Sequence, residues 1–247
     1  GLPGLFAVGE AACWDMHGFN RLGGNSLAET IVAGRVVGMR IAEFVGRGGP
    51  GPDTALGKAG QREQEQRVRA LAERPAGGRS LSRIRDEMGE IMMNRLGVLR
   101  TGAEIETAVA DLRRLLEEVA TVGLRATAPG PNPELTYGLR LPGMLRLALV
   151  TAEGALARKE SRGAHHRTDY PKRNDAEWLN RTLARWSPGA DAPTLSYEPV
   201  GLLDLPPGHR GYGATGHVDL EGGVDEYNQR VAAAQAAEGC LATAEPI

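Results

Sequence analysis

The chain has 247 residues, and its 29 Lys and Arg against 31 Asp and Glu give a formal net charge of −2. This balance argues against nucleic acid as a partner held by bulk charge, because there is no basic surplus to neutralise phosphates. Hydrophobic residues make up 41% and charged residues 24% of the chain, a composition typical of a folded globular protein.

No stretch of about 18 apolar residues is present, so we predict no direct membrane span. The longest candidate, residues 26–45, is interrupted by four charged residues. The chain opens on Gly1 and runs directly into an apolar segment. From this abrupt opening we expect the sequence to be a piece of a longer protein.

The first block, residues 1–50, has the pattern of a strand followed by a helix. Residues 5–10 (LFAVGE) predict a short buried strand that ends in a Gly-Glu turn. A polar, glycine-rich loop covers residues 15–24. A helix is then expected from Asn25 or Ser26 to about Val45, before a Gly/Pro-rich linker.

The second block, residues 51–160, predicts an up-down bundle of three to four helices. A polar helix is expected over 56–73, and apolar residues spaced by three and four mark a buried stripe over 81–92. Thr101 and Glu104 form a capping box at the start of another helix. The last helix is expected after Pro142 and up to Lys159.

The third block, residues 161–247, is irregular and mixed. We expect one helix over 176–186, one strand over 194–200, a Pro/Gly-rich loop over 206–216 and a helix within 225–237. The predicted fold class is therefore α+β, mostly α, with these three blocks as its domains.

The segment from His17 to Leu27 is the strongest local motif. Its glycine pair, Gly23-Gly24, comes just before a helix start, where free backbone N–H groups and the helix dipole favour an anion. Arg21 adds a planar guanidinium that can bind a carboxylate through two hydrogen bonds. The order of strand, acidic turn and glycine-rich helix start is that of a Rossmann-type cofactor site, but no G-x-G-x-x-G follows a strand here. The residues alone fit a cofactor site and a glycine-rich turn with a surface arginine equally well.

Two motifs together carry a resemblance to a known family. Residues 4–10 (GLFAVGE) and 17–27 (HGFNRLGGNSL) resemble the C-terminal half of the succinate dehydrogenase/fumarate reductase flavoprotein subunit. Residues 158–170 (RKESRGAHHRTDY), 178–183 and 194–198 resemble the terminal region of the same subunit. Residues 11–17 and 206–214 are similar to the branch of quinol:fumarate reductases that has a dihaem membrane anchor. The resemblance implies that residues 1–50 are the last strand-helix unit of a Rossmann-like FAD domain.

The resemblance assigns roles to six residues. It implies that Arg21 binds a carboxylate of fumarate or succinate. His17, a second candidate for substrate binding, is implied to shape the loop beside the substrate. For FAD, the resemblance implies that Glu10 bonds the ribityl chain. It also implies that the backbone amides of Ser26 and Leu27, at the helix start that Asn25 begins, meet the pyrimidine edge of the flavin. The family's proton-transferring residues precede this segment, so no catalytic residue is assigned. No metal site is predicted, and His165-His166 is interpreted as structural.

The intact subunit is expected to exchange electrons with an iron–sulfur subunit and, through a membrane anchor subunit, with quinone. Its expected location is the cytoplasmic side of the bacterial inner membrane, attached through those partners. The chain alone is expected to be inactive, because it would supply only one wall of the active site.

Two alternatives remain open at this point. One is a stand-alone helical interaction module with a vestigial cofactor edge. The other is a soluble relative such as L-aspartate oxidase, which shares the Asn-Arg…Asn-Ser-Leu pattern but fits residues 11–17 less well.

Overall fold

The computed structural model describes residues 3–12, 17, 23–49, 54–126 and 130–200. The chain divides into two compact units, one comprising 1–178 and 183–196 and the other 179–182 and 197–247. No helix in the described part of the chain is long and apolar enough to span a bilayer. The expected loop over 206–216 and helix within 225–237 lie outside the described residues, and the proposed block boundaries stay predictions.

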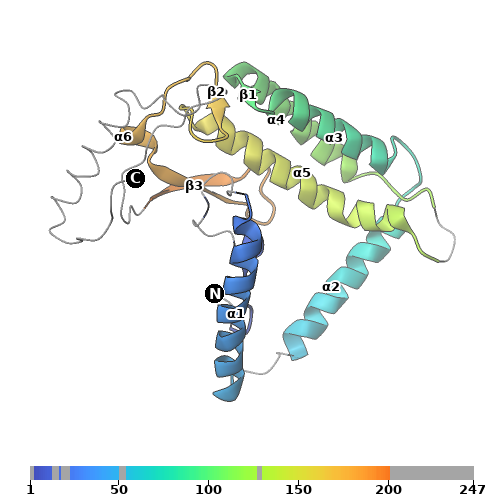
Figure 1. Cartoon of the computed structure of the whole chain (residues 1–247). Coiled ribbons are helices and arrows are strands. Elements are labelled where there is room, and N and C mark those ends of the chain that lie inside the picture. Colours follow the sequence, from blue (N-terminus) through green and yellow to red (C-terminus); the bar gives the residue numbers. More distant parts are fainter. Residues whose placement is uncertain (1–2, 13–16, 18–22, 50–53, 127–129, 201–247) are drawn as a thin grey trace. The chain divides into compact units, whose positions relative to one another are not determined.

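Three helices, α3 (Leu81–Arg95), α4 (Gly102–Val119) and α5 (Pro133–Ala157), pack side by side and enclose the core (Figure 1). The C-terminal end of α2 (Thr54–Ala72) joins them through Leu71, which lies against Gly138 of α5. A Cβ at Gly138 would approach Leu71 Cδ2 to 2.5 Å, so any larger residue at this position would force the Leu71 side chain to move. The predicted bundle is therefore present. Its fully buried large apolar side chains are those of Leu81, Ile84, Ile105, Leu112, Leu115, Val119, Leu141, Leu145 and Leu149.

Helix α4 begins with the predicted capping box. The Glu104 N–H donates to Thr101 Oγ1 at 3.3 Å, and Thr101 Oγ1 donates to Glu104 Oε2 at 2.9 Å. Ser80 caps α3 and Asn132 caps α5 in the same way, each accepting a bond from the N–H three residues later. Each cap satisfies an N–H group that the helix itself leaves open.

Helix α5 starts earlier than predicted and runs through Pro142. Proline inside a helix removes one backbone hydrogen bond and usually ends the helix. Here Asn132 caps the first turn, Pro133 occupies a position where its missing N–H costs nothing, and the buried Leu141 anchors the turns before Pro142 in the core. Packing of these turns outweighs the local cost of Pro142.

The segment after α5 joins two helix ends through one ion pair. Arg167 is buried, and its Nη1 donates to the carbonyls of Ala155 at 3.0 Å and Leu156 at 3.1 Å, at the C-terminus of α5. Its Nε and Nη2 bind both carboxylate oxygens of Asp169, at 2.7 and 2.6 Å. Asp169 Oδ2 in turn accepts the Gly102 N–H, at the start of α4, at 3.0 Å. A cation at one helix C-terminus and an anion at another N-terminus both complement the helix dipoles.

A second ion-pair network surrounds Glu160, whose side chain is fully buried. Its carboxylate accepts bonds from Arg158, Arg162 and the Asn174 N–H at 2.7–3.0 Å. Burial alone would raise the pKa of Glu160, but these hydrogen bonds outweigh it and hold the pKa below its usual range. The arginine-rich segment, residues 158–173, therefore forms a structural ion-pair network with Glu160 and Asp175. It links residues 158–162 with residues 174–175.

The prediction of a helix over 176–186 is wrong. The structure has a single turn, α6 (Asp175–Trp178), followed by strand β3 (Asn180–Arg185), which pairs with β4 (Thr194–Pro199) in a two-stranded sheet. The apolar residues Leu179, Leu183 and Trp186 have helical spacing, but pairing with a strand later in the chain decides the conformation. The strand predicted over 194–200 is confirmed by β4. Strands β1 (Leu99–Arg100) and β2 (His166–Arg167) form a short parallel pair.

The strand expected over residues 5–10 is also absent. Residues 5–8 have no regular structure, and Gly9–Ala12 form a 3-10 helix, η1. A strand needs a hydrogen-bonded neighbour, and no described segment lies alongside these residues as a strand. The following helix, α1 (Asn25–Gly46), confirms the prediction. Phe6 packs edge-on against Phe44 of α1, with 5.6 Å between the ring centroids.

Candidate functional site

The N-terminus of α1 is open. Gly24 precedes the helix in the left-handed conformation (φ 81°), which glycine adopts without strain, and it has no side chain to cap the first turn. The N–H groups of Leu27 and Ala28 donate to Gly24 O at 3.1 and 3.2 Å. Within the described residues, the N–H groups of Asn25 and Ser26 have no acceptor. Two backbone donors without a partner among the described residues thus lie at the positive end of a 22-residue helix.

The turn that carries Glu10 lies against the same helix. Gly9, with φ 65°, is buried, and a Cβ built on it would be 3.8 Å from Thr30 Oγ1. Thr30 Oγ1 donates to Ser26 O at 2.8 Å. The Glu10 side chain is exposed. The structure therefore brings the acidic turn and the first two turns of α1 together, as a cofactor site made of both would need.

His17 is bonded to a residue that the motif analysis did not select. His17 Nε2 lies 2.8 Å from Oε2 of Glu29, whose side chain is only 2% exposed. A buried carboxylate is costly unless it is hydrogen-bonded, so this contact is a strong local constraint. A signal for Glu29 was present in the sequence. It is in register with Val32, Ala33, Val36 and Val37 on one face of the helix, where a charged residue is unexpected.

This face of α1 and residues 7–12 line a pocket of about 400 Å³. Apart from Glu29, the lining is apolar: Ala7, Val8, Gly9, Ala12, Val32, Ala33, Val36 and Val37. Among the described residues that line this pocket, Glu29 is thus the one carboxylate in an otherwise apolar set. Arg21, the candidate substrate-binding residue, lies outside the described residues.

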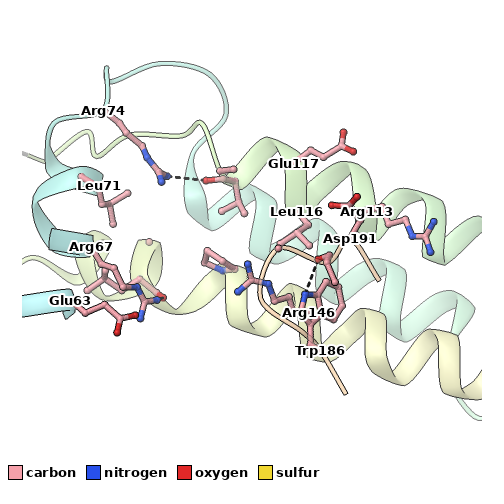
Figure 2. A pocket seen from close by; sticks show the side chains of 18 residues that line it. Glu63, Arg67, Leu71, Arg74, Arg113, Leu116, Glu117, Arg146, Trp186 and Asp191 are labelled. Atoms are coloured by element: carbon pink, nitrogen blue, oxygen red, sulfur yellow. Dashed lines mark hydrogen bonds between the residues drawn. The ribbon is translucent and has the colours of Figure 1, made fainter. Parts of the chain in front are cut away.

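A larger pocket, of about 770 Å³, lies among α2, α4, α5 and residues 186–191 (Figure 2). Its arginines have partners within the fold. Arg74 donates to the Val119 and Val122 carbonyls at 3.3 and 3.4 Å, Arg113 binds Glu153 at 2.6 Å, and Arg146 lies over the Trp186 ring. Figure 2 shows Arg146 beside Trp186, whose indole N–H donates to the Ala190 carbonyl at 3.0 Å. These contacts join the surrounding elements, and we assign no ligand to this pocket.

His165 is enclosed by cations. Arg100 Nη1 donates to His165 Nδ1 at 3.0 Å, and His165 Nε2 donates to the Arg158 carbonyl at 3.2 Å. Burial lowers the pKa of His165, and the charges of Arg100, Arg167 and Arg158 lower it further, against the opposing effect of the Arg158 carbonyl. Both ring nitrogens are used in holding the segment after α5, which agrees with a structural role for this residue.

The residues at the start of α1 fit a flavin nucleotide. Open N–H groups at a helix N-terminus suit the electron-rich pyrimidine edge of a flavin, and a carboxylate such as that of Glu10 can accept bonds from sugar-like hydroxyls. No atom of another described residue, apart from the chain neighbours, lies within 4 Å of where a Cβ on Gly23 or Gly24 would be, so this part of the chain leaves room for a ligand to approach the backbone closely.

Two known families match this chain, one over its N-terminal segment and one over the helical bundle and the residues after it. Residues 85–212 match the family model described as "Fumarate reductase flavoprotein C-term", and residues 1–27 match that of an FAD binding domain. The first match covers the bundle and the arginine-rich segment, and the second ends within the first turn of α1.

Individual proteins give the same result. The chain is 42% identical over 219 residues to a fumarate reductase flavoprotein subunit of Helicobacter pylori, covering 87% of this chain and 30% of that protein. It is 38% identical over 232 residues to the subunit of Escherichia coli, covering 93% and 38%. A solved quinol fumarate reductase of E. coli superposes with a TM-score of 0.75 at 37% identity, covering 84% of this chain and 35% of that one.

The chain therefore spans about a third of the length of the relatives it matches. The family resemblance predicted from the two motifs is confirmed, and so is the mostly helical fold class. The chain belongs to the fumarate reductase flavoprotein C-terminal family.

Proposed function

We propose that this chain is part of a flavoprotein subunit that interconverts fumarate and succinate, and that it forms one wall of the active site. The observation that carries this proposal is the open, glycine-led N-terminus of α1 beside the Glu10 turn, in a segment that matches an FAD binding domain. When bound there, FAD would supply hydride transfer to and from the carbon–carbon bond of the dicarboxylate.

The chain's own residues bind and orient in this proposal. The backbone N–H groups of Asn25 and Ser26 donate to the flavin edge, and Glu10 accepts bonds from the ribityl hydroxyls. The Leu27 N–H, to which the family resemblance also gave a flavin contact, is bonded to Gly24 O, so Leu27 completes the helix turn behind them. Arg21 binds one carboxylate of the substrate through a paired hydrogen bond and holds it beside the cofactor. His17 shapes the loop that carries Arg21. The residues that move protons lie in the part of the subunit that precedes this chain.

The exposed apolar face of α1 supports the same conclusion. Leu27, Ile31, Val32 and Val45 are all more than 60% exposed, although they are large and apolar. A helix of this composition gains stability only when another surface covers it. We infer that the remainder of the FAD domain covers α1 in the complete subunit.

Partners follow from the relatives. A solved relative is named as a quinol fumarate reductase, so a multi-subunit respiratory complex is the setting that we propose. Electrons would pass between FAD, an iron–sulfur subunit and a membrane anchor that binds quinone. The flavoprotein would then be peripheral, on the cytoplasmic side of the bacterial inner membrane.

The test uses the complete subunit with Arg21→Ala. Loss of a charge-assisted, two-bond contact to substrate should lower kcat/KM for fumarate about a thousandfold or more. FAD content, measured by visible absorbance, should be unchanged, because Arg21 contacts the substrate. Arg40→Ala is the control, since Arg40 lies on the exposed side of α1 and bonds Glu43 at 3.0 Å. Near-normal fumarate reduction by the Arg21 variant would refute this assignment.

A further inference from the structure

Glu29 is a charged residue, yet it is buried on α1, whose large apolar side chains are mostly exposed. It lies in the second turn of α1, and only 4% of the residue is exposed. By contrast, the acidic residue farther along the same helix, Glu43, is exposed and bonds Arg40 on the surface. Keeping Glu29 buried requires compensation, which the bond to His17 supplies at 2.8 Å.

The Glu29–His17 bond joins two segments that the proposed function uses. His17 is at the end of the stretch that begins with η1, and Glu29 is in the helix whose first turn provides the open N–H groups. Directly beside Glu29, Thr30 faces Gly9 of η1, with its Oγ1 3.8 Å from where a Cβ on Gly9 would lie, and it bonds Ser26 O. Residues 29 and 30 therefore support the Glu10 turn, the chain after it and the start of α1 together.

We propose that Glu29 is a positioning residue of the flavin site, which acts through His17 and fixes the spacing between the Glu10 turn and the N-terminus of α1. Glu29 itself does not contact the cofactor in this proposal. The inference rests on the proposed function, because it takes FAD as the ligand of that site. It deepens that function by assigning a role to a residue outside the motif.

The experiment measures FAD binding by the complete flavoprotein subunit. Glu29→Ala should raise the dissociation constant of FAD about 10- to 100-fold, the effect of losing a hydrogen bond to a charged group. Glu29→Gln keeps a side chain of the same shape that can still bond His17, and it should stay within about threefold of the wild type. The visible circular dichroism of bound FAD should change in the alanine variant only. Glu43→Ala is the matched control and should bind FAD normally.

His17→Ala provides a second route to the same answer. It should weaken FAD binding, and the double variant should lose less than the sum of the two single variants, because both single changes remove the same His17–Glu29 bond. If Glu29→Ala does not fold, the His17 variant carries the test by itself. Normal FAD binding by the folded variants, additive effects, or a Glu29→Gln variant as weak as Glu29→Ala would each overturn the inference. A wild-type subunit that binds no FAD would overturn the proposed function as well.

Discussion

The α3–α5 bundle and the η1–α1 region place their apolar side chains differently. In the bundle, three helices bury a continuous core, with Leu112, Leu145 and Leu149 fully inaccessible to solvent. In α1 the only buried residue is a glutamate, and most of its large apolar side chains are exposed. The bundle therefore has the contacts it needs for stability, whereas α1 has a surface that needs a partner. If the proposed function holds, stability and cofactor binding are divided between these two regions.

A matched pair of valine substitutions tests this division. Val109 in the bundle core is 9% exposed and Val36 on α1 is 48% exposed. Val→Thr replaces one methyl group by a hydroxyl of similar size, and burying that hydroxyl costs about 1–3 kcal/mol. In this chain Val109→Thr should lower the free energy of unfolding by that amount, while Val36→Thr should change it by less than about 0.5 kcal/mol. Urea denaturation measures both.

The same Val36→Thr change in the complete subunit sharpens the comparison. If the rest of the FAD domain covers α1, the substitution should then cost about 1–2 kcal/mol, because the hydroxyl would be buried. An equally silent Val36→Thr in both proteins would contradict the proposed coverage of α1.

The free energy of unfolding should depend on pH through His165, in the segment that follows α5. The pKa of His165 is lowered in the folded chain, so the unfolded chain takes up a proton first as the pH falls. Stability from this group is therefore complete above the unfolded pKa of about 6.5 and decreases as the pH falls below it. The slope contributed by one proton is at most about 1.4 kcal/mol per pH unit. His165→Gln should remove it, as measured by urea denaturation between pH 7.5 and 5. A variant that keeps the wild-type slope would exclude His165 as its source.

The carboxylates of the same segment act at lower pH. The hydrogen bond from Arg167 lowers the pKa of Asp169 well below its usual range, and that of Glu160 is also lowered. Their contributions are present above about pH 4–5 and are lost as the pH falls towards the folded pKa values. The histidine effect therefore appears first on acidification, and the two ranges can be separated in one titration.

Local signals in the sequence predicted the bundle but not the contacts between distant segments. Apolar spacing and the Thr101–Glu104 capping box gave α3 and α4, because both depend on residues within a few turns. The strand over Asn180–Arg185 could not be found in this way, since it forms by pairing with Thr194–Pro199. Similarly, α5 continues through Pro142 because of packing against other helices. In both cases tertiary contacts outweigh local preference.

The candidate site shows the same limit. The glycine pair and Glu10 could be predicted because they belong to motifs of residues that are close together in the sequence. The structure brings the Glu10 turn to α1. Glu29 was missed because its importance comes from burial and from a bond to a residue 12 positions away. The double role of Arg167 and Asp169 at two helix ends was missed for the same reason. A charged residue in register with an apolar helix face is the signal that would have selected Glu29.

The smallest expected effect concerns a helix cap in the bundle. Thr101→Ala removes the acceptor of the Glu104 N–H and the donor to its carboxylate, so it should lower the free energy of unfolding by about 1 kcal/mol. Thr107→Ala is the control: Thr107 lies inside the same helix, is exposed, and bonds only its own helix at Ala103 O. It should be neutral within about 0.5 kcal/mol.

The start of α1 offers the contrast, since Gly24 has no side chain that caps the helix. Gly24→Ser would add one, but at a left-handed φ of 81° that disfavours serine, and it would compete for the N–H groups proposed to bind FAD. If Gly24→Ser stabilises this chain but weakens FAD binding by the complete subunit, the start of α1 is left uncapped for the ligand. If FAD binding by the Gly24→Ser subunit is unchanged, the N–H groups at the start of α1 are not part of the FAD site.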